Sequence, residues 1–218
     1  TYLQDNSMPL ESMDAYYENI KIFKELDEKS LEASKWLANT FGECKNTVGY
    51  GIANTHRLAV APNLSSALIC GGVSQGIEPI YKNAYVQGTS SGEMNRINPS
   101  LLKVLKRYDK YTDEVISDII NNNGSVQHLP FLSDHEKAVF KTAFEIDQKQ
   151  LIRLASARQR YIDQAQSINL FFSADEDEGY ISEVHQLAFK DKYIKSLYYI
   201  RSESGVQASK GECEACAG

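Results

Sequence analysis

The chain has 218 residues, of which 42% are hydrophobic and 24% charged, and its formal net charge is -6 at pH 7. These values are ordinary for a globular protein, and the length suits one large domain or two small ones. The sequence lacks the clustered Lys and Arg that a nucleic-acid binder needs to neutralise phosphates. No apolar run approaches the ~20 residues that span a bilayer. The sequence therefore predicts a cytoplasmic protein that binds neither nucleic acid nor membrane.

A long amphipathic helix is the first predicted element. From Ser12 to Phe41 apolar side chains recur at roughly helical spacing, and Gly42 follows as a stop signal. Farther along, the apolar run at 58–61 has the length and composition of a buried strand. A turn and a short helix follow it, and the Gly-Gly pair at 71–72 ends that helix.

The rest of the chain is mainly helical, with a few extended segments. We expect irregular or short extended structure at 77–92, helices at 100–107, 112–122, from 133, 145–164 and 181–188, and extended segments at 167–172 and 197–200. From residue 202 onward the residues are small and polar. That composition buries little apolar surface, so it predicts a mobile tail.

The four cysteines fall into two kinds. Cys44 and Cys70 stand singly, which predicts buried or partly buried free thiols. Cys213 and Cys216 form a pair near the end of the chain, where two thiols can close a small-ring disulfide and reopen it by exchange. A mobile tail would let such a pair shuttle electrons between two partners. Half of a zinc site or two incidental surface thiols are the alternatives, although the sequence has no second CxxC or His pair to complete four ligands.

The turn between the predicted strand and short helix is a candidate phosphate site. Its residues are Pro62, Asn63, Leu64, Ser65 and Ser66. Backbone N–H groups in the first turn of a helix are unpaired and favour anions, and Ser65 and Ser66 add hydroxyl donors. An ordinary capped helix start is the simpler interpretation on these residues alone.

Tyr198 and Tyr199 are a candidate redox pair. Adjacent residues of a strand point to opposite faces, which predicts one aromatic in the core and one at the surface. In the alternative interpretation, two neighbouring phenols pass an oxidising equivalent along, because a tyrosine can lose an electron and a proton together.

Three groups of motifs, in this order, resemble class I ribonucleotide reductase large subunits. Residues 54–62, the serines at 65–66 and residues 71–79 are similar to the phosphate-binding segment of that family. Residues 159–167 with Asn169 resemble the helix-to-strand segment near the end of the same barrel. The Leu-Tyr-Tyr sequence at 197–199, a short tail and the terminal cysteine pair complete the order, so the resemblance covers essentially the whole chain.

The resemblance implies an α/β fold and an oxidoreductase. Residues 1–200 would be the C-terminal, helix-rich part of the ten-stranded α/β barrel, and residues 201–218 a flexible redox-active tail. With an N-terminal companion chain and a radical-generating small subunit, the protein would convert ribonucleoside diphosphates to deoxyribonucleoside diphosphates.

The family's functional residues map onto three places in this sequence. The turn from Pro62 to Ser66 would hold the substrate diphosphate, mainly through backbone N–H groups and the two serines, because the family often has Thr or Ser where Asn63 and Leu64 stand. Tyr198 and Tyr199 would relay the radical from the small subunit. Cys213 and Cys216 would reduce the active-site disulfide and be reduced in turn by thioredoxin or glutaredoxin. Residues 181–197 lie where the family docks the small subunit's tail.

The sequence also departs from the family pattern. The cysteine that becomes a thiyl radical, the active-site cysteine pair and the acid–base Glu and Asn all lie upstream of the matched region, and neither Cys44 nor Cys70 matches them. We therefore expect no activity from this chain alone. We also expect no bound cofactor or metal in it, the metal centre and radical being in the small subunit.

A split subunit that assembles with an N-terminal companion through large apolar surfaces is the preferred hypothesis. The alternative is a non-catalytic docking module for the small subunit.

Overall fold

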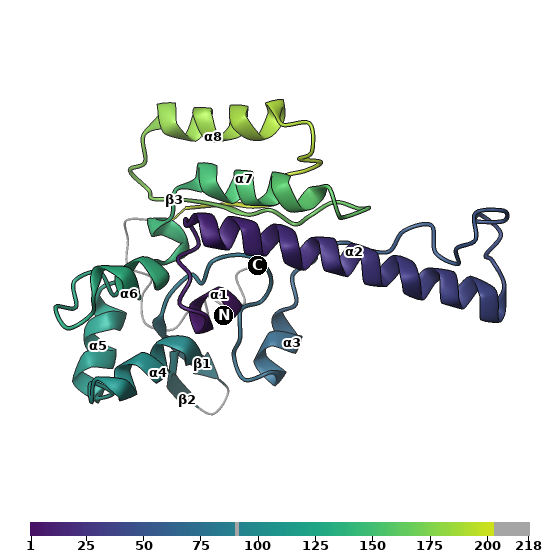
Figure 1. The fold of residues 1–218 in the computed structure, drawn as a ribbon. Coiled ribbons are helices and arrows are strands. Elements are labelled where there is room, and N and C mark those ends of the chain that lie inside the picture. Colours follow the sequence, from purple (N-terminus) through teal and green to yellow (C-terminus); the bar gives the residue numbers. More distant parts are fainter. Residues whose placement is uncertain (90–91, 203–218) are drawn as a thin grey trace.

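The computed structural model describes residues 1–89 and 92–202 (Figure 1). The helices in chain order are α1 (Tyr2–Asp5), α2 (Met13–Phe41), α3 (Leu64–Ile69), α4 (Pro99–Arg107), α5 (Asp113–Asn121), α6 (Asp134–Val139), α7 (Gln148–Gln159) and α8 (Glu178–Lys190), with one 3-10 turn, Ala143–Glu145. The strands are β1 (Ala84–Thr89), β2 (Gly92–Ile97), β3 (Leu170–Phe172) and β4 (Ile200–Ser202). None of the helices in the described ranges is both long and apolar enough to cross a membrane.

The long predicted helix is confirmed as α2. The Ser12 side chain accepts a hydrogen bond from the Ala15 N–H at 3.1 Å, which caps the start of the helix. Gly42 ends it with φ +91°, a conformation that side chains disfavour. The first half of α2 packs on α7, whereas its far end projects from the rest of the molecule (Figure 1). Trp36 and Phe41 at that end are 60% and 76% exposed.

Residues 84–140 form a small lobe with its own core. Helices α4, α5 and α6 and the hairpin β1–β2 enclose Leu101, Leu105, Ile119 and Phe140, which are almost fully buried. The two strands pair antiparallel from Ala84 with Ile97 to Thr89 with Gly92. Strand β1 agrees with the irregular or short extended structure expected at 77–92, whereas β2 was not predicted. Strand β2 exposes nearly all its side chains, so it lacks the apolar alternation that marks a strand.

The part that positions the candidate site is an extended segment at 164–172 with chain on both sides. On one side Val60 forms a parallel bridge with Gln166, and on the other β3 pairs in parallel with β4. The predicted strand at 58–61 is thus reduced to a single bridge. Helices α7 and α8 cover this segment and share with it a core that contains Ile152, Leu170 and Val184. Parallel extended segments covered by helices are the expected α/β arrangement.

Helix α7 is shorter than the helix predicted at 145–164. Its Asp147 cap accepts a hydrogen bond from the Lys149 N–H at 3.0 Å, so the helix begins at Gln148. At its other end, the Gln159 side chain donates to the Ile162 and Gln164 carbonyls at 3.0 and 2.7 Å. These contacts stabilise the turn that leads from α7 into the extended segment.

Candidate functional site

The two candidate motifs flank the same extended segment. The Ser167 N–H donates to the Val60 carbonyl at 3.0 Å, just ahead of the candidate phosphate turn. On the other side, the Tyr198 N–H donates to the Ile168 carbonyl at 2.8 Å. The structure therefore brings together segments that lie more than 130 residues apart in the sequence, and it joins both to the residues after α7.

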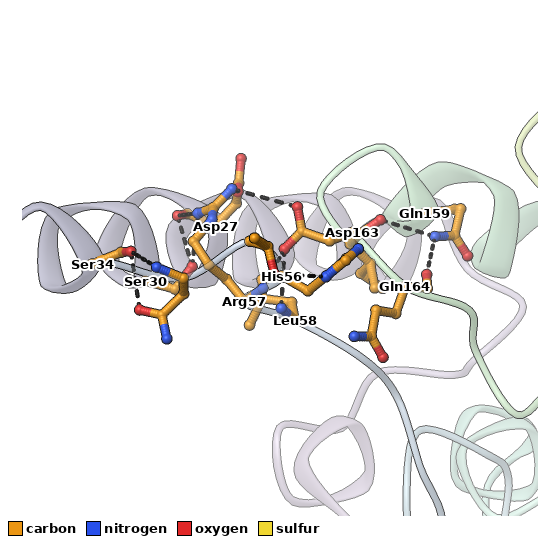
Figure 2. Close-up of polar contacts among 12 residues, drawn as sticks. Asp27, Ser30, Ser34, His56, Arg57, Leu58, Gln159, Asp163 and Gln164 are labelled. Atoms are coloured by element: carbon orange, nitrogen blue, oxygen red, sulfur yellow. Dashed lines mark hydrogen bonds and ion pairs between the residues drawn. The ribbon is translucent and has the colours of Figure 1, made fainter. Parts of the chain in front are cut away.

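Arg57 anchors the approach to the phosphate turn (Figure 2). Its guanidinium donates to the Asp27 carboxylate at 2.7 Å and to the Ser30 hydroxyl at 2.9 Å, both on α2. The backbone N–H groups of Arg57 and Leu58 donate to one Asp163 carboxylate oxygen at 2.7 and 3.1 Å. The network links three parts of the chain, namely α2, the 57–58 segment and the turn after α7.

The environment of Asp163 favours its charged form. Burial by itself would raise the pKa of Asp163, but the N–H donors of Arg57 and Leu58 and the nearby Arg57 charge outweigh it and lower that pKa below its ordinary value. The Asp163 backbone carbonyl also accepts a hydrogen bond from Lys195 Nζ at 2.6 Å. Asp163 thus contacts both the segment before the phosphate turn and the segment before the tyrosine pair.

Tyr198 and Tyr199 lie against each other. Their ring centroids are 4.0 Å apart with an interplanar angle of 51°. The side chains are 53% and 40% exposed, so the expectation of one core and one surface ring was wrong. Regular strand begins only at Ile200, and strict alternation of faces does not hold ahead of it. The hydrogen bond with the Tyr199 side chain raises the pKa of Tyr198, so this phenol keeps its proton at neutral pH.

Arg201 lies between Tyr199 and a third tyrosine. Its guanidinium carbon is 5.0 Å from the Tyr199 ring centroid and 5.4 Å from that of Tyr81. Burial raises the pKa of Tyr81 to about 12, and its buried hydroxyl has no hydrogen-bond partner among the described residues. Oxidation of a phenol at neutral pH requires that its proton leave. The exposed pair is therefore better suited to that chemistry than Tyr81.

Asn169 contacts the tyrosine pair and is itself bound by Glu78. The Asn169 side-chain oxygen accepts a hydrogen bond from the Tyr199 N–H at 3.0 Å, and its amide nitrogen donates to Glu78 at 3.0 Å. Both residues belong to the sequence motifs, but this contact was not predicted. Glu78 and Asn169 are 91 positions apart, and no local sequence pattern predicts a contact at that separation.

A small cavity borders the same two residues. It measures about 20 Å³ and is lined by Glu78, Asn169, Arg158, Ser167 and neighbouring apolar side chains. That volume has room for one water molecule, so this cavity does not hold a nucleotide.

The candidate phosphate turn is exposed. Pro62, Asn63, Ser65 and Ser66 all face solvent. The Ala67 N–H donates to the Asn63 carbonyl at 3.0 Å, which makes Asn63 the residue that starts α3. The Asn63 side-chain nitrogen donates to the Ala61 carbonyl at 3.2 Å. The donors of the first turn thus lie at an open surface.

The structure describes two of the four cysteines. Cys213 and Cys216 lie outside the described residues. Cys44 and Cys70 are exposed free thiols, so the expectation of burial was wrong for both. The Thr47 hydroxyl lies 3.2 Å from the Cys44 sulfur and lowers the pKa of Cys44.

The comparison with protein families decides the family. A family model described as "Ribonucleotide reductase, barrel domain" matches residues 44–200. The chain belongs to this ribonucleotide reductase family. The resemblance inferred from the sequence motifs is therefore confirmed, as is the interpretation of the fold as part of the α/β barrel.

Individual relatives agree with this assignment. A frog virus 3 (isolate Goorha) protein described as a ribonucleoside-diphosphate reductase large subunit is 40% identical over 228 residues, which is 100% of this chain and 40% of that protein. The Danio rerio ribonucleoside-diphosphate reductase large subunit is 31% identical over 90% of this chain and 29% of its own length.

A solved structure is similar as well. The alpha subunit of the Actinobacillus ureae class Id ribonucleotide reductase matches with a TM-score of 0.82 and 40% identity, over 93% of this chain and 37% of that one. The chain thus spans two fifths or less of the length of these reductase subunits.

A basic groove lies between α7 and α8. It has a volume of about 340 Å³ and is lined by Lys149, Arg153, Glu183, Gln186, Leu187 and Lys190. Three cations and one carboxylate give the groove a positive balance. Lys149 forms an ion pair with Glu183 at 2.5 Å, which joins the two helices across it.

Replacing Asp163 with Asn should lower the free energy of unfolding of the chain by an amount that depends on pH. Because the folded-state pKa of Asp163 is lowered, its carboxylate stabilises the fold above the unfolded pKa of about 3.9 and loses this effect as pH falls through the folded value. We expect a loss of about 1 kcal/mol at neutral pH, modest because the carboxylate is partly exposed. Urea unfolding at several pH values measures it. A difference of the same size at pH 7 and in acid would contradict the role of the charge.

Proposed function

We propose that this chain supplies three parts of a ribonucleoside-diphosphate reductase large subunit: the substrate-phosphate grip, the last tyrosines of a radical relay and a reducing cysteine tail. The thiyl-forming cysteine and the acid–base residues belong to the N-terminal part of the large subunit, so this chain is inactive alone. The observation that carries the proposal is the contact between Tyr198 and Tyr199, at 4.0 Å, beside a segment that also bonds the approach to the phosphate turn.

The tyrosine pair passes one oxidising equivalent. A phenoxyl radical on one ring takes an electron and a proton from the neighbouring phenol, so the first ring is restored and the radical moves to the second. The oxidising equivalent comes from the metal-containing small subunit. The protonated state of Tyr198 at neutral pH means that electron and proton move together. The 4.0 Å ring contact keeps donor and acceptor adjacent.

The phosphate grip is the open turn at the start of α3. The backbone N–H groups and hydroxyls of Ser65 and Ser66 donate hydrogen bonds to the diphosphate of a ribonucleoside diphosphate, with Pro62, Asn63 and Leu64 shaping the turn. Helix α3 has only six residues, so its dipole adds little and the individual donors do most of the holding. The exposure of this turn leaves the donors accessible.

The tail supplies reducing equivalents. Each turnover of the reductase leaves a disulfide in the active site. Cys213 and Cys216 reduce it by thiol–disulfide exchange, giving two electrons and two protons and becoming a disulfide themselves. Thioredoxin or glutaredoxin then restores the two thiols.

The groove between α7 and α8 docks the small subunit. Four of its lining residues lie at 183–190, inside the range where the family binds the small subunit's tail. Its positive balance suits an acidic peptide. The metal centre and the radical belong to that small subunit, and this chain binds no cofactor of its own. The cytoplasmic location and the split into two chains stay predictions.

Changing Tyr198 or Tyr199 to Phe should abolish turnover of the assembled reductase, because Phe has no phenolic hydrogen to give up. Substrate binding should be unchanged. Steady-state assays and substrate titration measure both. Tyr17→Phe is the matched control, since Tyr17 also contacts a neighbouring tyrosine, at 5.7 Å, but lies on α2. Normal turnover in either relay variant would exclude the relay role.

Changing both Ser65 and Ser66 to Ala should raise KM for the substrate and leave kcat nearly unchanged. Each hydroxyl contact contributes about 1 kcal/mol in the ground and transition states alike, so KM rises by roughly tenfold or more. Thr40→Ala, an exposed hydroxyl at the far end of α2, is the control. A fall in kcat at constant KM would argue against a grip that only binds.

Changing Cys213 or Cys216 to Ser should stop turnover driven by thioredoxin or glutaredoxin but spare turnover driven by a small dithiol, which reaches the active site directly. Cys44→Ser and Cys70→Ser are controls, since both thiols are exposed but unpaired. An equal loss with protein and small-molecule reductants would count against the shuttle.

A further inference from the structure

We propose that Asn169, held in place by Glu78, is a positioning residue for the tyrosine relay. The inference rests on the proposed function, because it concerns how Tyr199 is kept in register with Tyr198. The contact of Asn169 with Tyr199 is through the backbone N–H, and Glu78 in turn holds Asn169, so we assign both a positioning role.

The contacts form a continuous chain of hydrogen bonds. The Asn169 side-chain oxygen accepts from the Tyr199 N–H at 3.0 Å. The Asn169 side-chain nitrogen donates to one Glu78 oxygen at 3.0 Å, and its backbone N–H donates to the other at 3.2 Å. The side-chain oxygen of Asn169 thus accepts from Tyr199, and its side-chain and backbone nitrogens both donate to the Glu78 carboxylate. This arrangement fixes the orientation of its amide.

Burial makes this arrangement hard to replace. Asn169 is 7% exposed, and a buried amide or carboxylate without partners is strongly unfavourable. Desolvation raises the pKa of Glu78, while the Asn169 donors and the charges of Arg201 and Arg158 act in the opposite direction. Each polar group is thus stable here only because of the others.

The same contacts restrict the tyrosine ring. The backbone of Tyr199 is held at both ends, since its N–H donates to Asn169 and its carbonyl accepts from the Leu170 N–H at 2.9 Å. With the backbone fixed, only the side-chain torsions can move the ring away from Tyr198. Arg201, whose charge interacts with Glu78, lies 5.0 Å from the Tyr199 ring centroid and restricts that movement further.

A neighbouring amide provides a matched control. Gln148 is also buried, and its side-chain oxygen accepts from the Phe171 N–H at 2.9 Å on the same extended segment. It holds β3 but makes no contact with Tyr198 or Tyr199 among the described residues. A purely structural role for Asn169 would therefore be matched by Gln148.

The test uses the full large subunit assembled with its small subunit. Tyr199 is replaced by 3-aminotyrosine, which is oxidised more easily than tyrosine and so traps the radical at this position. Radical yield is measured by electron paramagnetic resonance in the Asn169→Ala and Gln148→Ala backgrounds. Melting temperature and the steady-state constants are measured on the same variants with the natural tyrosine.

We expect Asn169→Ala to lower the radical yield and kcat by about tenfold or more with KM unchanged, because displacing a reacting group by about an ångström is enough for such losses. Gln148→Ala should lose comparable stability and keep its radical yield. Glu78→Gln should reduce the yield less, since Gln keeps one of the two acceptor oxygens while its NH2 group faces the other Asn169 donor. It also covers the case in which Asn169→Ala does not fold.

A radical yield equal to that of the unsubstituted protein in Asn169→Ala, or in Glu78→Gln if the former does not fold, would overturn the inference. An equal loss in Gln148→Ala at equal stability would also overturn it. These failures differ from failure of the proposed function. If Tyr199→Phe supports normal turnover, the relay itself is wrong. If Tyr199→Phe is inactive but Asn169 has no effect, only the positioning role is wrong.

Discussion

The backbone hydrogen bonds of the extended segment at 164–172 are the constraint on which the candidate site depends. One side of the segment bonds Val60, which leads into the phosphate turn, and the other side bonds the tyrosine pair and β4. Each backbone group in such a segment needs a partner once helices α7 and α8 cover it. Satisfying that need brings two remote parts of the sequence to the same place, and the Arg57–Asp163–Lys195 contacts reinforce the arrangement.

The sequence predicted the elements that carry their own local signals. Ser12 and Gly42 mark the two ends of α2, and Ser133 and Glu136 form the capping box that starts α6. The family motifs identified the reductase barrel, because their order is far more specific than any one of them. Tyr198 and Tyr199 were assigned to the relay through the same motifs, and the structure adds that their ring centroids lie 4.0 Å apart.

Other features had no local signal. The hairpin strand β2 carries exposed side chains on both faces, so its sequence does not alternate. The ring contact at Tyr198 and Tyr199 contradicts simple strand geometry because regular strand begins one residue later. The Glu78–Asn169 contact joins residues 91 positions apart. The exposure of Cys44 and Cys70 likewise depends on which surfaces the fold covers, which the residues around each thiol do not determine.

A cryo-electron microscopy structure of the large subunit, assembled with its small subunit and a ribonucleoside diphosphate, tests the account most directly. The account predicts the diphosphate at the start of α3, within hydrogen-bond reach of Ser65 and Ser66. It also predicts Tyr198 and Tyr199 in contact with each other on the path from the small subunit to the substrate. A diphosphate bound elsewhere, or a tyrosine pair turned away from that path, would contradict it.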